Sequence, residues 1–251
     1  MNNNFSKKEN IAILLCAGKS KRVNEFDKST VELNNKPLFL YSLNKLLNSK
    51  KINKIILVAS KDNFDFIKNF VFKLNLQNVE VIHGSSIERK YSVSKAIAFI
   101  KKYSPKTVLI HDSARPFFDS KIIYEGFKLL DKSSCAIPVV KIVDTVKKIN
   151  NDKALSTIDR KNLFYSQTPQ FFNYDLLANL IDKDIDSTTY TDEAQLFEAN
   201  NIDVARIEGN LNNHKITFKN DLNQFKKISG NSLFTGIASD VHELSPGENL
   251  F

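Results

Sequence analysis

Cationic residues follow a short apolar run near the beginning of the chain. The segment Ile11 to Leu15 is apolar and partly β-branched, which is typical of a buried strand. A loop with Gly18 follows it, and Arg22 and Lys28 come next. Because backbone N–H groups in such a loop can point at an anion that the cations neutralise, this stretch predicts a phosphate site. Its spacing matches neither the P-loop nor the G-x-G-x-x-G motif, so an ordinary turn with solvated lysines remains the alternative.

Arginine is rare in this chain, and its positions are therefore informative. The sequence holds 36 lysine and arginine residues, and five of them are arginine. Since lysine supplies the general surface charge, an arginine indicates a place where a planar, bidentate fork is needed for phosphate or carboxylate. Four of the five fall in loop-like stretches beside predicted strand ends, namely Arg22, Arg89, Arg115 and Arg160.

The segments that must position these residues alternate between two patterns. Short apolar runs predict strands at 11–15, 54–59, 79–82, 107–110 and 135–139. Amphipathic segments predict helices at 37–47, 62–74, 89–100 and 120–130. This alternation is typical of an α/β protein with a Rossmann-like, mostly parallel sheet that has helices on both faces.

The edge of that sheet is where a ligand is expected. In parallel sheets, ligands bind beyond the carboxyl ends of the strands, because the loops that follow the strands converge there. We therefore expect one crevice to hold Arg22, Lys28, Arg89, Asp112 and Arg115.

Residues 141–166 interrupt the alternation. Two β-like runs flank the turn-forming sequence at 150–152, which predicts a β-hairpin arm. An arm that leaves a compact domain often reaches a second subunit, so a homodimer is expected. Further along, 167–170 leads into a helix, and Thr191 or Asp192 caps another. Late strands at 204–207 and 215–218 and a closing helix at 220–228 complete the predicted domain.

Composition narrows the class of protein. The chain has 251 residues, of which 42% are hydrophobic, and a net charge of +8. Its lysines are dispersed rather than interleaved with aromatic residues in a block, which argues against a nucleic-acid surface. No apolar run approaches the ~20 residues of a membrane span, and no secretory signal opens the sequence. Two cysteines in strand-like runs favour buried thiols and a cytoplasmic location.

Motifs along residues 11–228 add a family resemblance. They are CAGKSKR with Lys28, ERKYSV at 88–93, HDSARP at 111–116, DT at 144–145, DR at 159–160, TPQ at 168–170, TDEA at 191–194 and EG…NHKIT at 208–217. In this order they resemble the 2-C-methyl-D-erythritol 4-phosphate cytidylyltransferases, which have a nucleotidyltransferase fold. The resemblance implies that a substrate phosphate attacks the α-phosphorus of CTP with Mg²⁺ present, giving the cytidine diphosphate derivative and pyrophosphate.

The resemblance also implies residue roles. The implied catalytic residues are Arg22, Lys28, Arg160 and Lys215. Those implied to bind CTP are Cys16, Ala17, Gly18, Gly84, Arg89, Ser92 and Ser113. Those implied to bind methylerythritol phosphate are Asp112, Arg115, Arg160, Thr191 and Lys215. Arg160, on the arm, would act in the partner subunit's site. His111 is expected to be a packed residue without a catalytic role.

The last residues carry a second resemblance. Residues 235–251 resemble the beginning of 2-C-methyl-D-erythritol 2,4-cyclodiphosphate synthase, a later enzyme of the same isoprenoid pathway. Asp240 and His242 match two of its divalent-metal ligands, for an ion such as Zn²⁺. Because residues two apart on a strand face the same side, both can meet one ion. We expect a cytidylyltransferase domain at 1–229, a linker and truncated cyclase start at 230–251, and no cyclase activity from this sequence.

Other functions are compatible with parts of this pattern. A cytidylyltransferase for ribitol or glycerol phosphate shares the loop and an HD-x-x-RP motif, although TDEA, NHKIT and the tail argue against it. A sugar-phosphate nucleotidyltransferase is a broader alternative. A non-catalytic, nucleotide-binding scaffold is the alternative from another class, but it would not need Arg22, Lys28, Asp112 and Lys215.

Overall fold

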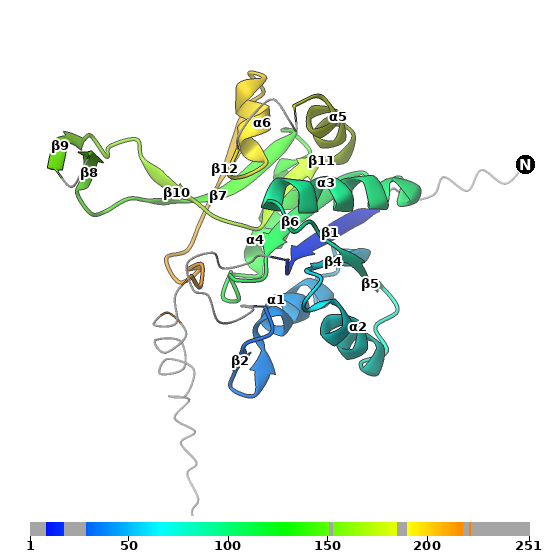
Figure 1. Cartoon of the computed structure of the whole chain (residues 1–251). Coiled ribbons are helices and arrows are strands. Elements are labelled where there is room, and N and C mark those ends of the chain that lie inside the picture. The colour runs from blue at the N-terminus through cyan, green and yellow to red at the C-terminus, as the bar shows by residue number, and fades with distance from the viewer. Residues whose placement is uncertain (1–8, 18–28, 151–152, 185–189, 218–220, 222–251) are drawn as a thin grey trace, which may run out of the picture.

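A computed structural model describes residues 9–17, 29–150, 153–184, 190–217 and 221 (Figure 1). The main sheet has eight strands in the order β10-β7-β11-β6-β1-β4-β5, with β12 also paired to β7. Its parallel half contains β1 (Asn10–Leu15), β4 (Lys54–Ala59), β5 (Val79–His83) and β6 (Thr107–Asp112). The other half contains β7 (Cys135–Lys141), β10 (Phe164–Ser166), β11 (Gln170–Asn173) and β12 (Val204–Glu208). The prediction of a mostly parallel α/β sheet is confirmed.

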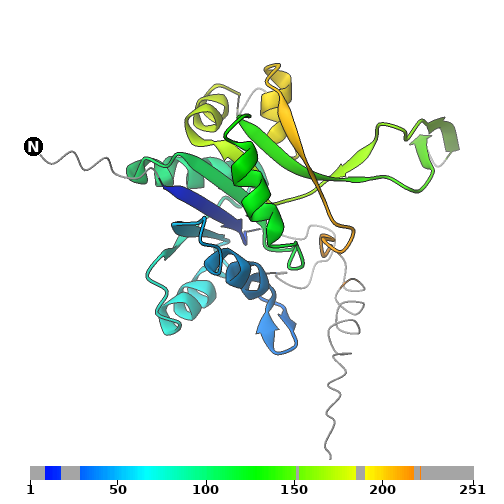
Figure 2. The ribbon, with the colours of Figure 1, turned by 180° about the vertical axis from the view of Figure 1, so that it is seen from behind.

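Helices cover both faces of this sheet. They are α1 (Leu38–Leu47), α2 (Phe64–Lys73), α3 (Arg89–Ile100), α4 (Lys121–Leu129), α5 (Tyr174–Asp184) and α6 (Ala194–Ala199), with a short 3₁₀ turn η1 (Lys101–Tyr103). Figure 2 brings α1 and α4 to the front, on the face opposite α3.

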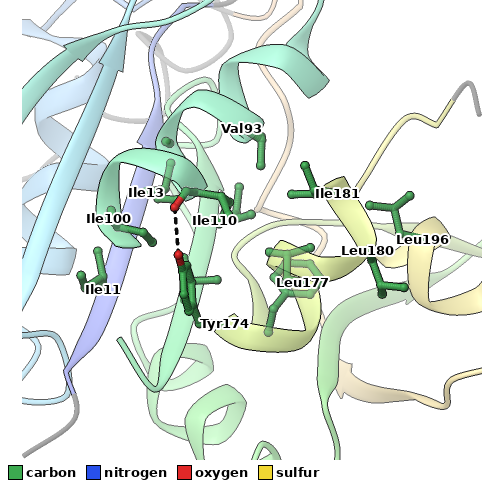
Figure 3. Close-up of a cluster of buried hydrophobic side chains, with 14 of the residues drawn as sticks. Ile11, Ile13, Val93, Ile100, Ile110, Tyr174, Leu177, Leu180, Ile181 and Leu196 are labelled. Atoms are coloured by element: carbon green, nitrogen blue, oxygen red, sulfur yellow. Dashed lines mark hydrogen bonds between the residues drawn. The ribbon is translucent and has the colours of Figure 1, made fainter. Parts of the chain in front are cut away.

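Strand β1 explains why two helical layers form. Because successive side chains of a strand point to opposite faces, Ile11 and Ile13 enter one buried cluster with α3, α5 and α6, whereas Ala12 and Leu14 enter another with α1, α2 and α4. Figure 3 shows the first cluster, in which the Tyr174 hydroxyl donates to the Ile97 carbonyl oxygen at 3.2 Å. An apolar strand buried on both faces therefore fixes the parallel half of the sheet at the centre of the fold.

Strand β11 is the main departure from the prediction. The sequence predicted that residues 167–170 lead into a helix, which is α5, but it did not predict that 170–173 first form a strand antiparallel to both β6 and β7. Phe171 and Phe172 are both fully buried, one on each face of the sheet. A strand of four residues is too short to show a period, and the apolar run of α5 follows it directly, so the pattern alone could not separate the two elements.

Two small hairpins stand apart from the main sheet. Strands β2 (Glu32–Leu33) and β3 (Lys36–Pro37) meet through Asn34 and Asn35, whose φ angles are 50° and 59°. Strands β8 (Val146–Asn150) and β9 (Lys153–Ile158) pair antiparallel in the predicted arm, which extends away from the body of the protein (Figure 1).

The end of the described chain departs from a second prediction. Residues 215–217 form no strand, although a strand was expected at 215–218. The Ile216 N–H donates instead to the Ala114 carbonyl oxygen at 2.8 Å, and the Ile216 side chain is buried. One such bond holds this segment against the loop after β6 without forming a ladder. Of the predicted 220–228 helix only Asp221 is described, in a helical conformation.

Candidate active site

Three loops begin side by side at the carboxyl edge of the parallel strands. The Cys16 N–H donates to the Val58 carbonyl oxygen at 2.8 Å, and the Ser113 N–H donates to that of Leu15 at 3.1 Å. The Gly84 N–H donates to the Ala59 carbonyl oxygen at 2.7 Å. Each bond extends the ladder by one step beyond its strand. The loops after β1, β5 and β6 therefore leave the sheet in register, as the strand pattern predicted.

Asp112, the last residue of β6, lies between two cations. Its Oδ1 accepts from Arg89 Nε at 3.2 Å, and its Oδ2 accepts from Lys215 Nζ at 2.7 Å. Arg89 begins α3, while Lys215 lies in the segment after β12. Two residues far apart in the sequence thus meet on one carboxylate.

Glu193 completes this cluster from the start of α6. Its two carboxylate oxygens accept from Arg89 Nη1 at 2.7 and 2.8 Å, and its side chain is 0% exposed. Glu193 was not predicted to be a site residue. It was recognised only as part of the TDEA motif, and its partner lies 104 residues away, beyond the range of any periodic pattern.

The electrostatics keep Asp112 ionised. Burial alone would raise the pKa of Asp112, but the charges of Arg89 and Lys215 outweigh it and hold that pKa well below its usual range. Burial raises the pKa of Glu193 above its usual value, although Arg89 opposes this. With Arg115 close to Asp112 and Arg89, three cations face two carboxylates, so the cluster carries one net positive charge when all are ionised. Such a cluster suits an anionic ligand.

Arg115 anchors the segment that carries Lys215. Its Nη1 donates to the Asn213 carbonyl oxygen at 2.8 Å, and Asn213 Nδ2 donates to the Thr168 carbonyl oxygen at 2.8 Å. Arg115 Nε is buried and has no hydrogen-bond partner among the described residues. The structure therefore places Arg115 in the cluster, with its Nε–H unpaired among the described residues.

Of the residues predicted to contact CTP, Cys16, Ala17, Gly84 and Ser113 lie in the three loops, whereas Arg89 and Ser92 lie in α3. The Cys16 carbonyl oxygen accepts from Ser29 Oγ at 2.8 Å, and Ser29 Oγ lies 3.1 Å from Ser113 Oγ. Ser92 Oγ accepts from the Ser85 N–H at 2.9 Å, which fixes the start of the loop after β5. A Cβ on Gly84 would lie 2.8 Å from that of Ala17, so glycine is required for these two loops to approach.

His111 is part of the packing beneath the site, as expected. It is 0% exposed, and its ring lies edge-on to Phe118. Its Nδ1 lies 2.8 Å from Thr168 Oγ1, and its Nε2 lies 3.1 Å from the Arg115 carbonyl oxygen. Burial lowers the pKa of His111 to about 3, so the ring is neutral at physiological pH.

Other predicted residues lie elsewhere. Arg160 is exposed on the arm between β9 and β10, outside the Asp112 cluster of its own chain. Thr191 is exposed, and its backbone N–H donates to Gln195 Oε1 at 2.7 Å. Glu193 occupies the N-cap position of α6, but the predicted Asp192 supplies the side-chain acceptor, because its Oδ1 accepts from the Gln195 N–H at 3.4 Å. The remaining predicted residues fall outside the described part of the chain, namely Gly18, Arg22, Lys28, Asp240 and His242.

Comparison with known proteins gives a consistent result. The family model described as 2-C-methyl-D-erythritol 4-phosphate cytidylyltransferase matches residues 10–229. A cytidylyltransferase of that name from Clostridium novyi is 36% identical over 230 residues, covering 89% of this chain and 97% of the relative. The bifunctional enzyme IspD/IspF of Pelagibacter ubique is 37% identical over 241 residues. This chain spans 61% of that relative's length.

Solved structures show the same fold. The 4-diphosphocytidyl-2C-methyl-D-erythritol synthase of Anaerococcus prevotii superposes with a TM-score of 0.78 at 29% identity, covering 89% of this chain and 96% of that one. The bifunctional IspDF of Campylobacter jejuni superposes with a TM-score of 0.71 at 29% identity, covering 86% of this chain and 54% of that one. The chain therefore belongs to the family of 2-C-methyl-D-erythritol 4-phosphate cytidylyltransferases.

Proposed function

We propose that this chain transfers CMP from CTP to 2-C-methyl-D-erythritol 4-phosphate, which gives 4-diphosphocytidyl-2-C-methyl-D-erythritol and pyrophosphate in isoprenoid biosynthesis. The observation that carries the proposal is the Asp112 cluster, which holds Arg89 and Lys215 at the carboxyl edge of the sheet in a chain of this family. Its net positive charge suits two anionic substrates brought together.

The chemistry requires no nucleophile from the protein. An oxygen of the substrate phosphate attacks the α-phosphorus of CTP, and the bond from that phosphorus to the pyrophosphate oxygen breaks, with its electron pair leaving on pyrophosphate. The protein must align two anions and offset the charge of the pentacoordinate phosphorus. Lys215, held at 2.7 Å by Asp112, and Arg115 would contact the phosphate of methylerythritol phosphate. Thr191 would join them from the loop before α6.

The nucleotide would occupy the loops after β1 and β5. Cys16 and Ala17 follow β1 and Gly84 follows β5, with Ser113 after β6 and with Arg89 and Ser92 at the start of α3. From the family motif, Gly18, Arg22 and Lys28 would enclose the triphosphate, with Arg22 and Lys28 stabilising the transition state. These roles stay proposals drawn from the resemblance.

Magnesium fits this site as a companion of CTP. In the part of the chain that the structure describes, no group of three or more His, Cys, Asp or Glu residues could hold a metal ion. Mg²⁺ commonly binds through substrate phosphates, waters and one or two carboxylates, so such a cage is not required. Asp112 is the carboxylate that the cluster offers to it. The bound ion would offset charge on the triphosphate.

The arm supports the proposal of a homodimer. Apolar side chains on and beside its strands are exposed in the single chain, including Ile149 at 56%, Leu155 at 57% and Tyr165 at 55%. Exposed apolar residues gathered on one projecting element mark an interaction surface. A second copy of the chain is the proposed occupant, and it would bring Arg160 to the partner's Asp112 cluster.

Two further expectations are kept as proposals. Residues 1–229 would form the cytidylyltransferase domain, and 230–251 a linker and the start of a cyclase-like domain, in which Asp240 and His242 would bind a divalent ion such as Zn²⁺. A cytoplasmic location is proposed from the buried thiols of Cys16 and Cys135. No helix in the described residues is long and apolar enough to span a membrane.

A substrate panel tests the proposed function. Purified protein would be incubated with CTP and Mg²⁺ and, separately, with methylerythritol 4-phosphate, ribitol 5-phosphate and glycerol 3-phosphate, and the products identified by mass spectrometry. The proposal expects a cytidine diphosphate product with methylerythritol 4-phosphate. A product formed only with another polyol phosphate would overturn the assignment of methylerythritol 4-phosphate as the substrate. If none of the three phosphates gave a product, the alternative of a binding scaffold would be favoured.

A further inference from the structure

The buried carboxylate of Glu193 does not cap the helix α6, which begins beside it. Glu193 is the N-cap residue of α6, yet its side chain makes no capping hydrogen bond to that helix. Both of its oxygens instead accept from Arg89 Nη1, at 2.7 and 2.8 Å. Because its side chain is 0% exposed, water does not compensate its charge. Arg89 is therefore the group that accounts for a carboxylate in this place.

Stability alone is a poor explanation for such a pair. A buried ion pair loses the hydration of both charges, and well-packed apolar residues of similar volume often stabilise a fold equally well or better. A buried ion pair is better explained when one residue fixes the other in a single orientation. Arg89 is the partner that needs fixing, because its long side chain begins α3 at the site edge and is 26% exposed.

Glu193 and Asp112 together fix the guanidinium plane of Arg89. Glu193 accepts a hydrogen bond from Nη1, and Asp112 Oδ1 accepts one from Nε at 3.2 Å. Two carboxylates therefore bind different nitrogens of one rigid, planar group. The other oxygen of Asp112 accepts from Lys215 at 2.7 Å. Charges of alternating sign thus run from Glu193 through Arg89 and Asp112 to Lys215. Without Glu193, the longer contact to Asp112 would be the carboxylate contact left to Arg89.

We infer that Glu193 is a positioning residue for the proposed reaction: it orients Arg89 for the nucleotide, and through Arg89 it sets Asp112 and Lys215 for the substrate phosphate. It does not itself contact either substrate. The inference rests on the proposed function, because it assigns Glu193 a part in that same site.

A double-mutant cycle tests this role. Glu193→Gln, Arg89→Met and the double variant would be compared for kcat and for KM of each substrate, with thermal stability measured alongside. Misplacement of the cluster should lower kcat/KM of Glu193→Gln on the order of tenfold to a hundredfold. In the Arg89→Met background the same change should cost less than about twofold, because the group that it positions is gone. Glu193→Asp, which keeps the charge on a shorter side chain, should recover part of the loss.

Other results would overturn the inference. An unchanged kcat/KM in Glu193→Gln would do so, as would an equal loss with and without Arg89, since an effect that acts through Arg89 disappears when Arg89 is absent. If the wild-type protein released no pyrophosphate, the proposed function would fail. The CTP dissociation constants of the same variants, measured by calorimetry, would then decide the positioning role, because Arg89 lies on the nucleotide side.

A spectroscopic measurement on the wild-type protein tests the same inference and does not require a Glu193 variant to fold. The chain has five arginines, so the ¹⁵N spectrum of its guanidinium groups is sparse and Arg89 can be assigned through Arg89→Lys. Two carboxylates gripping different nitrogens should slow rotation about the Nε–Cζ bond and give Arg89 two separate Nη signals. A single averaged signal in the wild-type protein would contradict the inference.

Discussion

Lys215 Nζ and Asp112 Oδ2 lie 2.7 Å apart, although the two residues are 103 positions apart in the sequence. Asp112 ends the strand β6, whereas Lys215 belongs to a segment without regular structure that Arg115 and Asn213 hold in place. The side chain of Lys215 is 43% exposed and that of Asp112 is 11% exposed. The carboxylate therefore holds the ammonium group at the surface of the protein, where the proposed substrate phosphate would meet it.

Gly84→Ala should impair CTP binding and lower stability. The added Cβ would lie 2.8 Å from Ala17 Cβ and 2.9 Å from Ser92 Oγ, so the loops after β1 and β5 would have to separate. Overpacking of this kind costs about 1–3 kcal/mol. The free energy of unfolding should fall by that amount and KM for CTP should rise, whereas Ser86→Ala, an exposed position in the same loop, should leave both nearly unchanged. An unaltered KM in Gly84→Ala would remove these loops from the nucleotide site.

Protonation of His111 should destabilise the fold as pH falls. Burial lowers its folded-state pKa to about 3, against an ordinary value of about 6.5, so between these pH values the unfolded chain binds a proton that the folded chain does not. Stability must therefore decrease as pH falls through this window, by up to about 1.4 kcal/mol per pH unit from this group. Asp112, whose pKa is also lowered, adds a loss of the same sign at more acidic pH.

Denaturant unfolding at pH 7, 6 and 5 measures this effect. The variant His111→Gln, which cannot gain the proton, should be less stable at pH 7 but should lose less stability between pH 7 and 5 than the wild-type protein. Equal slopes in the two proteins would show that the pKa of His111 is not lowered in the folded protein.

Leu155→Asp should disrupt the proposed dimer. Leu155 lies on the arm and is 57% exposed, so a charge there would be buried between copies if the arm forms the interface. Sedimentation velocity should show a dimer for the wild-type protein and a monomer for this variant. Leu211→Asp makes the same chemical change at a residue that is 56% exposed on the body of the protein, and it should remain dimeric. A dimeric Leu155→Asp would place the interface elsewhere.

Arg160→Ala should be complemented by a second inactive variant. If Arg160 serves the partner's site, a mixed dimer of Arg160→Ala and Asp112→Asn contains one site in which both residues are intact. Random reassociation makes half of the dimers mixed, so the mixture should regain roughly a quarter of the wild-type rate per subunit. Mixing without recovery would indicate that Arg160 acts in its own chain, or not at all.

Local sequence patterns predicted the strands and helices whose apolar residues form a continuous run or recur at a regular spacing. The apolar run at 54–59 corresponds to β4, which is buried on both faces, and the helix predicted at 89–100 corresponds to α3, whose buried residues recur at helical spacing. Strand β11 was missed because its four residues are too few to show a period. Residues 215–217 contain the buried Ile216 but pair through a single bond, which no alternation reveals.

The residues of the candidate site could be predicted from the sequence in part. The expectation that Arg89, Asp112 and Arg115 share one edge followed from the strand order, and the structure brings them together. Lys215 was assigned from the family motif, since no topological rule connects it with β6. Glu193 was not predicted as a site residue because, in the sequence, an acidic residue at the start of a helix resembles an ordinary first-turn carboxylate. Its burial and its partner become evident only in the structure.

The initial rate of pyrophosphate release from CTP and methylerythritol 4-phosphate, with Mg²⁺ present, tests the central claim most directly when Asp112→Asn is compared with the wild-type protein. Asparagine keeps the shape but removes the charge that holds Lys215, so kcat/KM should fall by about 10²–10³ while the variant still folds. A wild-type protein that releases pyrophosphate, together with a folded variant that has lost this activity, is the predicted result. Equal rates for the two proteins, or no release by the wild-type protein, would contradict the account.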